Sequence, residues 1–401
     1  MSVAKPLKIK VIHISTGYNG GAALAARRLN ESLNSSGFES HFGAISQKGY
    51  SPSESEFEIP RSAFSRLVSG IVTSLQINLS KKVFFSLFSM HVLPKNVITA
   101  RGNKDNTVLH FHNWFNLTNQ KEIAQWAKKG YKVVVTMHDQ RMMTGGCHYA
   151  FSCKGLYSNC KPCPELSKPL NRIPNLNLKR VANDLAPISG NVTFISPSRW
   201  LDSEAKKSYL LGNQRTIFIP NTLGNLQSST RKLSAQSGKK LLNIGIASMD
   251  PNSYIKGGDI TVSLEKLVRE QGIPIVFHYM KDFQQTNNGI EIFWSEIDYL
   301  MVISRADNSP NVIHEAKQRG IPVVASKVGG ITELLDSEFD VGLELVDCTE
   351  SKLLQVLNNL ISKIVDPSLK EGMHERYRKY IGLSVDEHIS MYEDLFLESK
   401  N

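Results

Sequence analysis

The stretch that decides the fold runs from Ile303 to Glu333 and reads ISRADNSPNVIHEAKQRGIPVVASKVGGITE. It follows a strand-like run, IDYLMVI, and carries Asp307 in a Ser-rich loop. We expect a helix over Asn311–Arg319, because Pro310 stands where proline is favoured in a first helical turn. The stretch therefore begins as a strand, a loop with an acidic residue, and a helix.

The second half of this stretch repeats the pattern. Gly320 stops the helix, IPVVAS predicts a buried parallel strand, and Gly329-Gly330 lead into a second helix start at ITELLD. The result is a βαβα unit with acidic groups and a glycine pair at the carboxyl ends of its strands. Open α/β sheets bind their ligands at that edge.

The two acidic residues and the glycine pair suit a nucleotide sugar. Glu315 lies eight positions after Asp307, and carboxylates accept hydrogen bonds from vicinal sugar hydroxyls. Adjacent glycines bare backbone N–H groups at a helix start, where phosphate is favoured. The alternative is that both acids are solvated helix-end charges and the glycines only form a turn, but the combination at this spacing favours a ligand site.

The stretch resembles the acid-x7-acid and glycine-pair signature of the family 4 glycosyltransferases, with Asp307 where Glu is usual. That resemblance implies a retaining enzyme of GT-B architecture. This α/β fold has two Rossmann-like domains whose parallel sheets face each other across a cleft, and its C-terminal helix crosses back to the first domain. Glu315 would bind the ribose hydroxyls and Asp307 would face the donor sugar. The implied donor-binding residues are Gly20, Gly21, Lys256, Asp307, Asn308, Asn311, Glu315, Gly329 and Gly330.

The length of 401 residues predicts two domains, because a single core rarely grows so large. We expect an acceptor-side domain over 1–221, a linker over 222–239, a nucleotide-sugar-binding domain over 240–380 and a terminal helix over 381–401. The first domain would carry a Cys-rich insert, 144–166, and a basic amphipathic region, 60–95.

The composition is that of a globular protein, with 41% hydrophobic and 21% charged residues. No apolar run reaches 18 residues, and the N-terminus moves directly into a strand without a signal-peptide pattern. We therefore expect a cytoplasmic protein, with attachment to the inner face of the cytoplasmic membrane as one option.

Charge is spread unevenly along the chain. Residues 1–200 hold 25 Lys and Arg against 10 Asp and Glu, a net charge of +15, whereas residues 201–401 hold 22 against 27, a net of −5. The basic half predicts an anionic partner. Nucleic acid, an anionic membrane surface and a pyrophosphate-linked acceptor are all compatible with it.

Two further loops carry candidate phosphate contacts. Gly20-Gly21 joins the first strand to the first helix, and by resemblance this loop faces the donor phosphates and the acceptor. Lys256 precedes another helix start, and the resemblance implies that it neutralises the departing diphosphate. The Arg that the family often places nearby is absent, so either Lys256 acts alone or Arg305 or another cation substitutes.

The histidines divide into cleft and core candidates. His138 and Asp139 end an apolar strand and project into the expected cleft, where the resemblance implies that His138 contacts the donor sugar or the reacting centre. His112 and Asp139 are assigned to the acceptor side, and His110 to the core. The catalytic set is thus His138, Asp307 and Lys256. The resemblance implies front-face substitution, with neither a dedicated general base nor a catalytic metal.

Four of the five cysteines cluster within seventeen residues. In a cytoplasmic chain a structural zinc site is favoured over two disulfides, and His148 could replace one ligand. The surrounding sequence resembles a Cys-rich insert of colanic-acid-type polysaccharide glycosyltransferases. The predicted metal ligands are Cys147, Cys153, Cys160 and Cys163.

Residues 60–95 mix apolar residues with Arg and Lys and contain no acid. They predict either a basic amphipathic helix lying on an anionic membrane or a helix packed on the first domain with a basic outer face. The membrane interpretation agrees with a lipid-linked acceptor.

The leading hypothesis is a retaining hexosyltransferase that moves a sugar from a nucleoside-diphosphate-sugar to a glycan or lipid-linked acceptor in cell-surface polysaccharide synthesis. A second hypothesis is a catalytically silent nucleotide-sugar binder. A zinc-stabilised nucleic-acid-binding protein is the third, and it is disfavoured because the chain contains no recognisable nucleic-acid-reading module.

Overall fold

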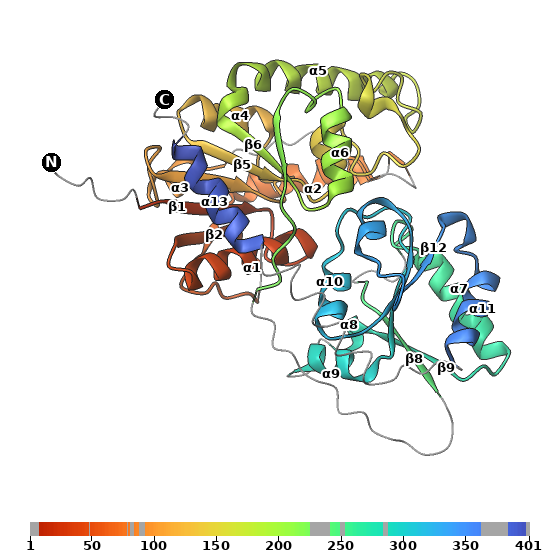
Figure 1. The fold of residues 1–401 in the computed structure, drawn as a ribbon. Helices are drawn as coiled ribbons and strands as arrows, with labels where there is room; N and C mark the ends of the chain where they lie inside the picture. The colour runs from red at the N-terminus through yellow and green to blue at the C-terminus, as the bar shows by residue number, and fades with distance from the viewer. Residues whose placement is uncertain are drawn as a thin grey trace. The chain divides into compact units, whose positions relative to one another are not determined.

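The computed structural model describes residues 8–47, 49–77, 79–80, 84–87, 93–224, 241–248, 253–283, 288–361 and 384–397. Most of the expected linker, 222–239, lies outside these residues. The chain divides into two compact units, one comprising 1–224 and 382–401, the other 225–381 (Figure 1). Among the described helices, none is both long enough and apolar enough to cross a bilayer.

The first unit is built on a seven-stranded parallel sheet with the order β3-β2-β1-β4-β5-β6-β7. Its strands are β1 (Lys10–Ser15), β2 (Glu39–Ile45), β3 (Glu56–Ile59), β4 (Thr107–Phe111), β5 (Lys132–Thr136), β6 (Val192–Ser196) and β7 (Arg215–Phe218). Its helices are α1 (Gly21–Ser35), α2 (Ala63–Ile77), α3 (Lys95–Thr99), α4 (Gln120–Lys128), α5 (Ile173–Leu185), α6 (Arg199–Lys207) and α13 (Ser384–Leu397).

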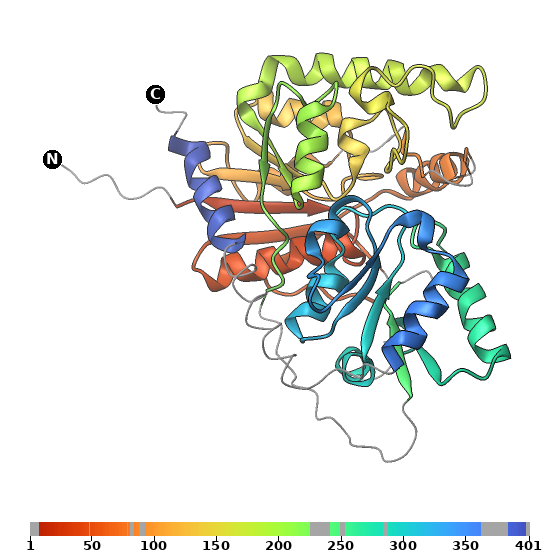
Figure 2. The same ribbon diagram turned by 45° about the vertical axis from the view of Figure 1, so that its right-hand side comes forward.

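The central strands of this sheet are buried on both faces, which explains their continuous apolar sequences. Helix α13 belongs to this unit although it lies at the far end of the chain. It packs beside α1, as Figures 1 and 2 show, and joins the hydrophobic cluster under the sheet. The predicted return of the terminal helix to the first domain is confirmed.

The second unit has a five-stranded parallel sheet with the order β12-β11-β10-β8-β9. Its strands are β8 (Leu242–Ile246), β9 (Ile275–Tyr279), β10 (Tyr299–Val302), β11 (Val323–Ser326) and β12 (Val341–Leu343). Its helices are α7 (Gly258–Glu270), α8 (Met280–Phe283), α9 (Gly289–Glu296), α10 (Asn311–Gln318) and α11 (Glu350–Ile361).

Two hydrophobic clusters cover the two faces of this second sheet. Alternate residues of β10 enter different clusters, because side chains along a strand point to opposite faces. Helices α7 and α11 lie side by side over one face, and α9 and α10 contribute to the other. The predicted fold class, two α/β units with parallel sheets, is confirmed.

Some local predictions differ from the structure. The sequence did not predict β3, α3, α5, α8, α9 and β12. The glycine pair begins a six-residue 3-10 helix, Gly329–Leu334, because Leu335 is already extended and an α-helix cannot continue. Within the region 60–95, helix α2 ends at Ile77, and Phe85 instead forms a β-bridge with Cys147.

Candidate functional site

Each sheet has a point where its strand order reverses. In the first unit this point lies between β1 and β4, and in the second unit between β8 and β10. Loops that leave adjacent strands there in opposite directions open a crevice at the carboxyl edge, which is where open α/β sheets bind ligands. The predicted site residues gather at these two points.

In the second unit, Lys256 follows β8 and Asp307 follows β10. The Lys256 Nζ lies 2.5 Å from Asp307 Oδ2, with the carboxylate buried and the lysine side chain 38% exposed. Gly257 sets this geometry, since its φ of +73° begins α7 and a Cβ there would lie 2.2 Å from the carbonyl oxygen of Ile303. Two predicted catalytic residues therefore meet at the switch point.

Arg305, the other cation considered for the diphosphate, is bound elsewhere. Its guanidinium donates to both oxygens of Asp259, at 2.6 and 2.8 Å, and to the carbonyl of Tyr254 at 2.7 Å. The hydrogen bond with Asp259 raises the pKa of Arg305 further. Lys256, rather than Arg305, thus stands beside Asp307.

The remaining donor-side residues surround Asp307. Glu315 is buried in α10, which begins at Asn311, and Asn308 is buried in the loop before it. The N–H of Gly330 donates to the carbonyl of Asp307 at 3.2 Å, so this amide holds the loop in place. Gly329 has a φ of +53°, which glycine adopts without strain.

In the first unit a pocket of about 260 Å³ lies at the carboxyl ends of β1, β4 and β5. Phe84, Trp114 and Phe115 form an aromatic part of its lining. The exposed pair Gly20-Gly21 precedes Ala22, another lining residue, and Gly20 has a φ of +92°. The polar lining includes Thr16, Asn113, Arg141 and the predicted His112, His138 and Asp139.

Three histidines form a hydrogen-bonded chain that runs from the sheet to this pocket. His13 Nδ1 lies 3.0 Å from His112 Nε2, and His112 Nδ1 lies 3.2 Å from His138 Nε2. Burial lowers the pKa of His13 to about 3 and that of His138 to about 4, and it lowers that of His112 strongly as well. All three imidazoles are therefore neutral at pH 7. His110 is buried as expected.

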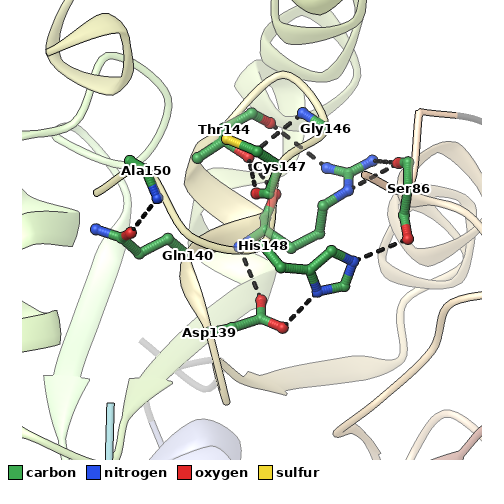
Figure 3. A network of polar contacts seen from close by, with 9 residues as sticks. Ser86, Asp139, Gln140, Thr144, Gly146, Cys147, His148 and Ala150 are labelled. Carbon is green, nitrogen blue, oxygen red and sulfur yellow. Dashed lines mark hydrogen bonds and ion pairs between the residues drawn. The ribbon is translucent and has the colours of Figure 1, made fainter. Parts of the chain in front are cut away.

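A second polar network holds other residues of the pocket lining, among them Asp139 and His148 (Figure 3). His148 donates or accepts through both ring nitrogens, to Asp139 Oδ2 at 2.6 Å and to Ser86 Oγ at 2.8 Å. Burial alone would raise the pKa of Asp139, but the charge and hydrogen bond of His148 outweigh it and the pKa falls. Arg141 donates to the carbonyl of Ser86 at 2.9 and 2.6 Å.

Neither Ser86 nor the pocket role of His148 was predicted from the sequence. No local pattern connects these two residues, because 62 positions separate them and contacts such as the bridge between Phe85 and Cys147 bring them together. His148 was considered as a spare zinc ligand. Its ring nitrogens bind Asp139 and Ser86 instead.

Two groups of side chains could be considered for a metal. Among the described residues, ring nitrogens of His13, His110 and His112 lie within 4.8 Å of one another. His110, however, uses both nitrogens for the hydroxyls of Tyr392 and Thr136, at 2.7 Å each, and the other two bond to each other. We therefore interpret this group as a hydrogen-bonded cluster.

The four clustered cysteines are free thiols and partly buried. Burial raises the pKa of Cys147 to about 12, and the neighbouring thiols of Cys160 and Cys163 add to this shift. The N–H of Gly155 donates to the sulfur of Cys153 at 3.4 Å. The thiols therefore influence one another electrostatically, but among the described residues no three of their sulfurs lie within 4.8 Å of one another, so a metal ion would have to draw them together.

Comparison with known proteins finds similarity both in sequence and in fold. No protein-family profile matches the chain. WcaC of Escherichia coli K12, which is named as a colanic acid biosynthesis glycosyl transferase, is 24% identical over 94% of this chain and 97% of WcaC. The fold is similar to that of the sucrose-phosphate synthase of Thermosynechococcus elongatus, with a TM-score of 0.61, 14% identity and coverage of 97% and 100% of the two chains.

A second solved structure, Anabaena HepE in complex with UDP, has a TM-score of 0.57 and 14% identity, and the match covers 96% of this chain and all of HepE. These similarities extend over both units and their parallel sheets. Together with the two parallel sheets, they show that the chain has the GT-B fold of known glycosyltransferases.

Proposed function

We propose that the chain transfers a hexose from a nucleoside-diphosphate-sugar to a glycan or lipid-linked acceptor in the synthesis of cell-surface polysaccharide. The observation that best supports this proposal is the contact between Lys256 and Asp307 at the switch point of the second sheet. Two similar proteins support it, since WcaC is named for colanic acid biosynthesis and HepE was solved with UDP and with UDP-glucose.

Each donor-side residue has a role that its chemistry suits. Glu315 accepts hydrogen bonds from the ribose hydroxyls, and Asp307 accepts them from the donor sugar. Lys256 exchanges its contact with Asp307 for the diphosphate, where a cation stabilises the negative charge that grows as the bond to the sugar breaks. Gly329, Gly330, Asn308, Asn311 and the loop of Gly20 and Gly21 supply further contacts to the donor.

The proposed transfer retains the configuration at the anomeric carbon. The acceptor hydroxyl attacks from the face that the diphosphate leaves, and a phosphate oxygen takes its proton. The chain contributes positioning and electrostatic stabilisation. A proton NMR spectrum of the fresh product tests this, because an inverted anomeric signal would contradict retention.

The donor roles are tested by measuring the binding and turnover of UDP- and GDP-sugars. Glu315→Gln and Asp307→Asn should each weaken donor binding about tenfold to a hundredfold, the value of a hydrogen bond to a charged group. Glu344→Gln, which changes an exposed carboxylate of the same unit, is the matched control. Donor binding without transfer would favour the silent binder, and unchanged affinity in both variants would refute the site.

We also propose that the first unit docks on an anionic membrane through α2. Four large apolar side chains spaced three or four residues apart share one face of this helix and are 54–76% exposed, namely Phe64, Leu67, Ile71 and Leu75. Residues 60–95 contain no acid, so their charges attract anionic lipid.

The segment that carries α2 is connected to the pocket. Thr73 donates to the side chain of Asn116 at 3.3 Å, Arg61 donates to the carbonyl of Asn116 at 2.7 Å, and Asn116 lines the pocket. A membrane-bound α2 would therefore bring the pocket close to lipid-linked acceptors. Leu67→Ser with Ile71→Ser should abolish co-sedimentation with phosphatidylglycerol vesicles, whereas Val262→Ser, at an exposed position on α7, should not. No binding by the unchanged protein would refute this docking.

For the cysteine cluster we propose a structural zinc ion held by Cys147, Cys153, Cys160 and Cys163. Thiolates are strong zinc ligands, and zinc would compensate the cost of ionising partly buried thiols. Purified protein should contain about one zinc per chain, and Cys147→Ser should lose it while Cys348→Ser keeps it. A zinc-free, fully folded protein would contradict this proposal.

A further inference from the structure

The three-histidine chain can hold its protons in only two ways. Because His13, His112 and His138 are neutral, each ring carries one proton and each hydrogen bond needs one donor nitrogen and one bare nitrogen. The protons therefore all point inward, from His138 to His13, or all point outward, from His13 to His138.

The inner end of the chain decides between these arrangements. His13 Nε2 is buried and has no hydrogen-bond partner in the part of the chain that the structure describes. In the inward arrangement His13 Nε2 would carry a buried N–H without an acceptor. In the outward arrangement the same atom would carry only an unshared lone pair. Orphaned buried N–H groups are rarer in proteins than under-satisfied acceptors, so the outward arrangement is favoured.

The outer end of the chain is His138, which lines the pocket. Its Nε2 accepts from His112 in the outward arrangement, so its single proton must sit on Nδ1. We propose that His112 is a positioning residue that fixes His138 in the Nδ1–H tautomer, so that His138 donates a hydrogen bond to an oxygen of the substrate and does not act as a general base. The substrate contact rests on the proposed function, but the tautomer does not.

The ring nitrogens of His148, the other histidine that lines the pocket, already bond to Asp139 and Ser86. In the outward arrangement His138 presents a donor. A substrate oxygen that approaches His138 therefore meets an N–H whose orientation is set before binding, which reduces the entropy lost on complex formation.

Long-range proton–nitrogen NMR on protein labelled with nitrogen-15 histidine reports the tautomer directly, because protonated and bare ring nitrogens have well-separated shifts. A His138→Gln variant identifies the signals of His138. We expect a protonated Nδ1 and a bare Nε2 for His138 at pH 7. A protonated Nε2 on His138 would overturn the proposal, whatever the activity of the protein.

Three substitutions test the positioning role. His112→Phe removes the donor to His138, so the His138 signals should shift toward a mixture of tautomers and kcat/KM should fall about twofold to tenfold, the size of one neutral hydrogen bond. His112→Gln supplies an amide donor and should restore the Nδ1–H signal. His13→Phe is the matched control, because it leaves His112 with a bare inner nitrogen and the same proton direction.

The possible outcomes separate this inference from the proposed function. The positioning role is supported if His138 shows a mixture of tautomers in His112→Phe but keeps the Nδ1–H form in His112→Gln and His13→Phe. An unchanged tautomer in His112→Phe, or a reversed one in His13→Phe, overturns it. If the tautomers follow the prediction but no nucleotide sugar is bound or transferred, the proposed function fails and the tautomer assignment stands.

Discussion

Replacing Gly257 by Ala tests whether the close backbone approach beside Lys256 is needed for the donor site. Gly257 has a φ of +73°, and an added Cβ would lie 2.2 Å from the carbonyl oxygen of Ile303. Real Cβ atoms essentially never come within 3.0 Å of such an atom, so the loop or the end of β10 must move by at least about 0.8 Å. Gly272 offers a matched control, since it has a φ of +62° but open space around it.

The expected effects differ between these two glycines. A left-handed conformation costs a non-glycine residue about 1–2 kcal/mol, and both variants bear this cost. Only Gly257→Ala adds the displacement of packed backbone, worth about 1–3 kcal/mol. We therefore expect Gly257→Ala to lower the free energy of unfolding of the second unit by about 2–5 kcal/mol, against about 1–2 kcal/mol for Gly272→Ala.

Hydrogen exchange measured by mass spectrometry across a urea series resolves the second unit from the first, because peptides from α7 and β8 report its opening. The same preparations should show lower donor turnover for Gly257→Ala, since a displaced loop moves Lys256 away from Asp307. Equal destabilisation of the two variants would refute the argument from close approach. Unchanged turnover in a destabilised Gly257→Ala would refute its link to Lys256.

Two further predictions concern the first unit. Tyr392→Phe removes the hydroxyl that bonds to buried His110 at 2.7 Å, so urea unfolding should show a loss of about 1–3 kcal/mol, whereas Tyr209→Phe, at a half-exposed position, should show almost none. For pH, burial lowers the pKa of folded His13 from 6.5 to about 3, so the unfolded chain binds the extra proton and stability falls as the pH drops below about 6.5. Between pH 7 and pH 5 this residue should lower the free energy of unfolding by about 2 kcal/mol. If the free energy of unfolding of the wild type falls no more steeply with pH than that of His13→Phe, the assignment is refuted.

Much of the fold could be predicted because its signals are local. Buried parallel strands appear as continuous apolar runs, and glycines mark helix starts such as α7. The same locality explains the elements that were not assigned. The segment EFEI of β3 is only four residues long, and the apolar run of α9 does not show a clear helical period.

The sequence alone brought the residues of the proposed donor site together. Asp307, Glu315 and the glycine pair follow one another around β10, α10 and β11, so their proximity follows from strand and helix geometry over about thirty residues. Tertiary structure decided what depends on contacts between distant segments. Ser86 reaches His148 across a β-bridge, and His13 meets His112 only because β1 and β4 are neighbours at the switch point. The direction of the histidine protons depends on the burial of one nitrogen, which a linear pattern does not encode.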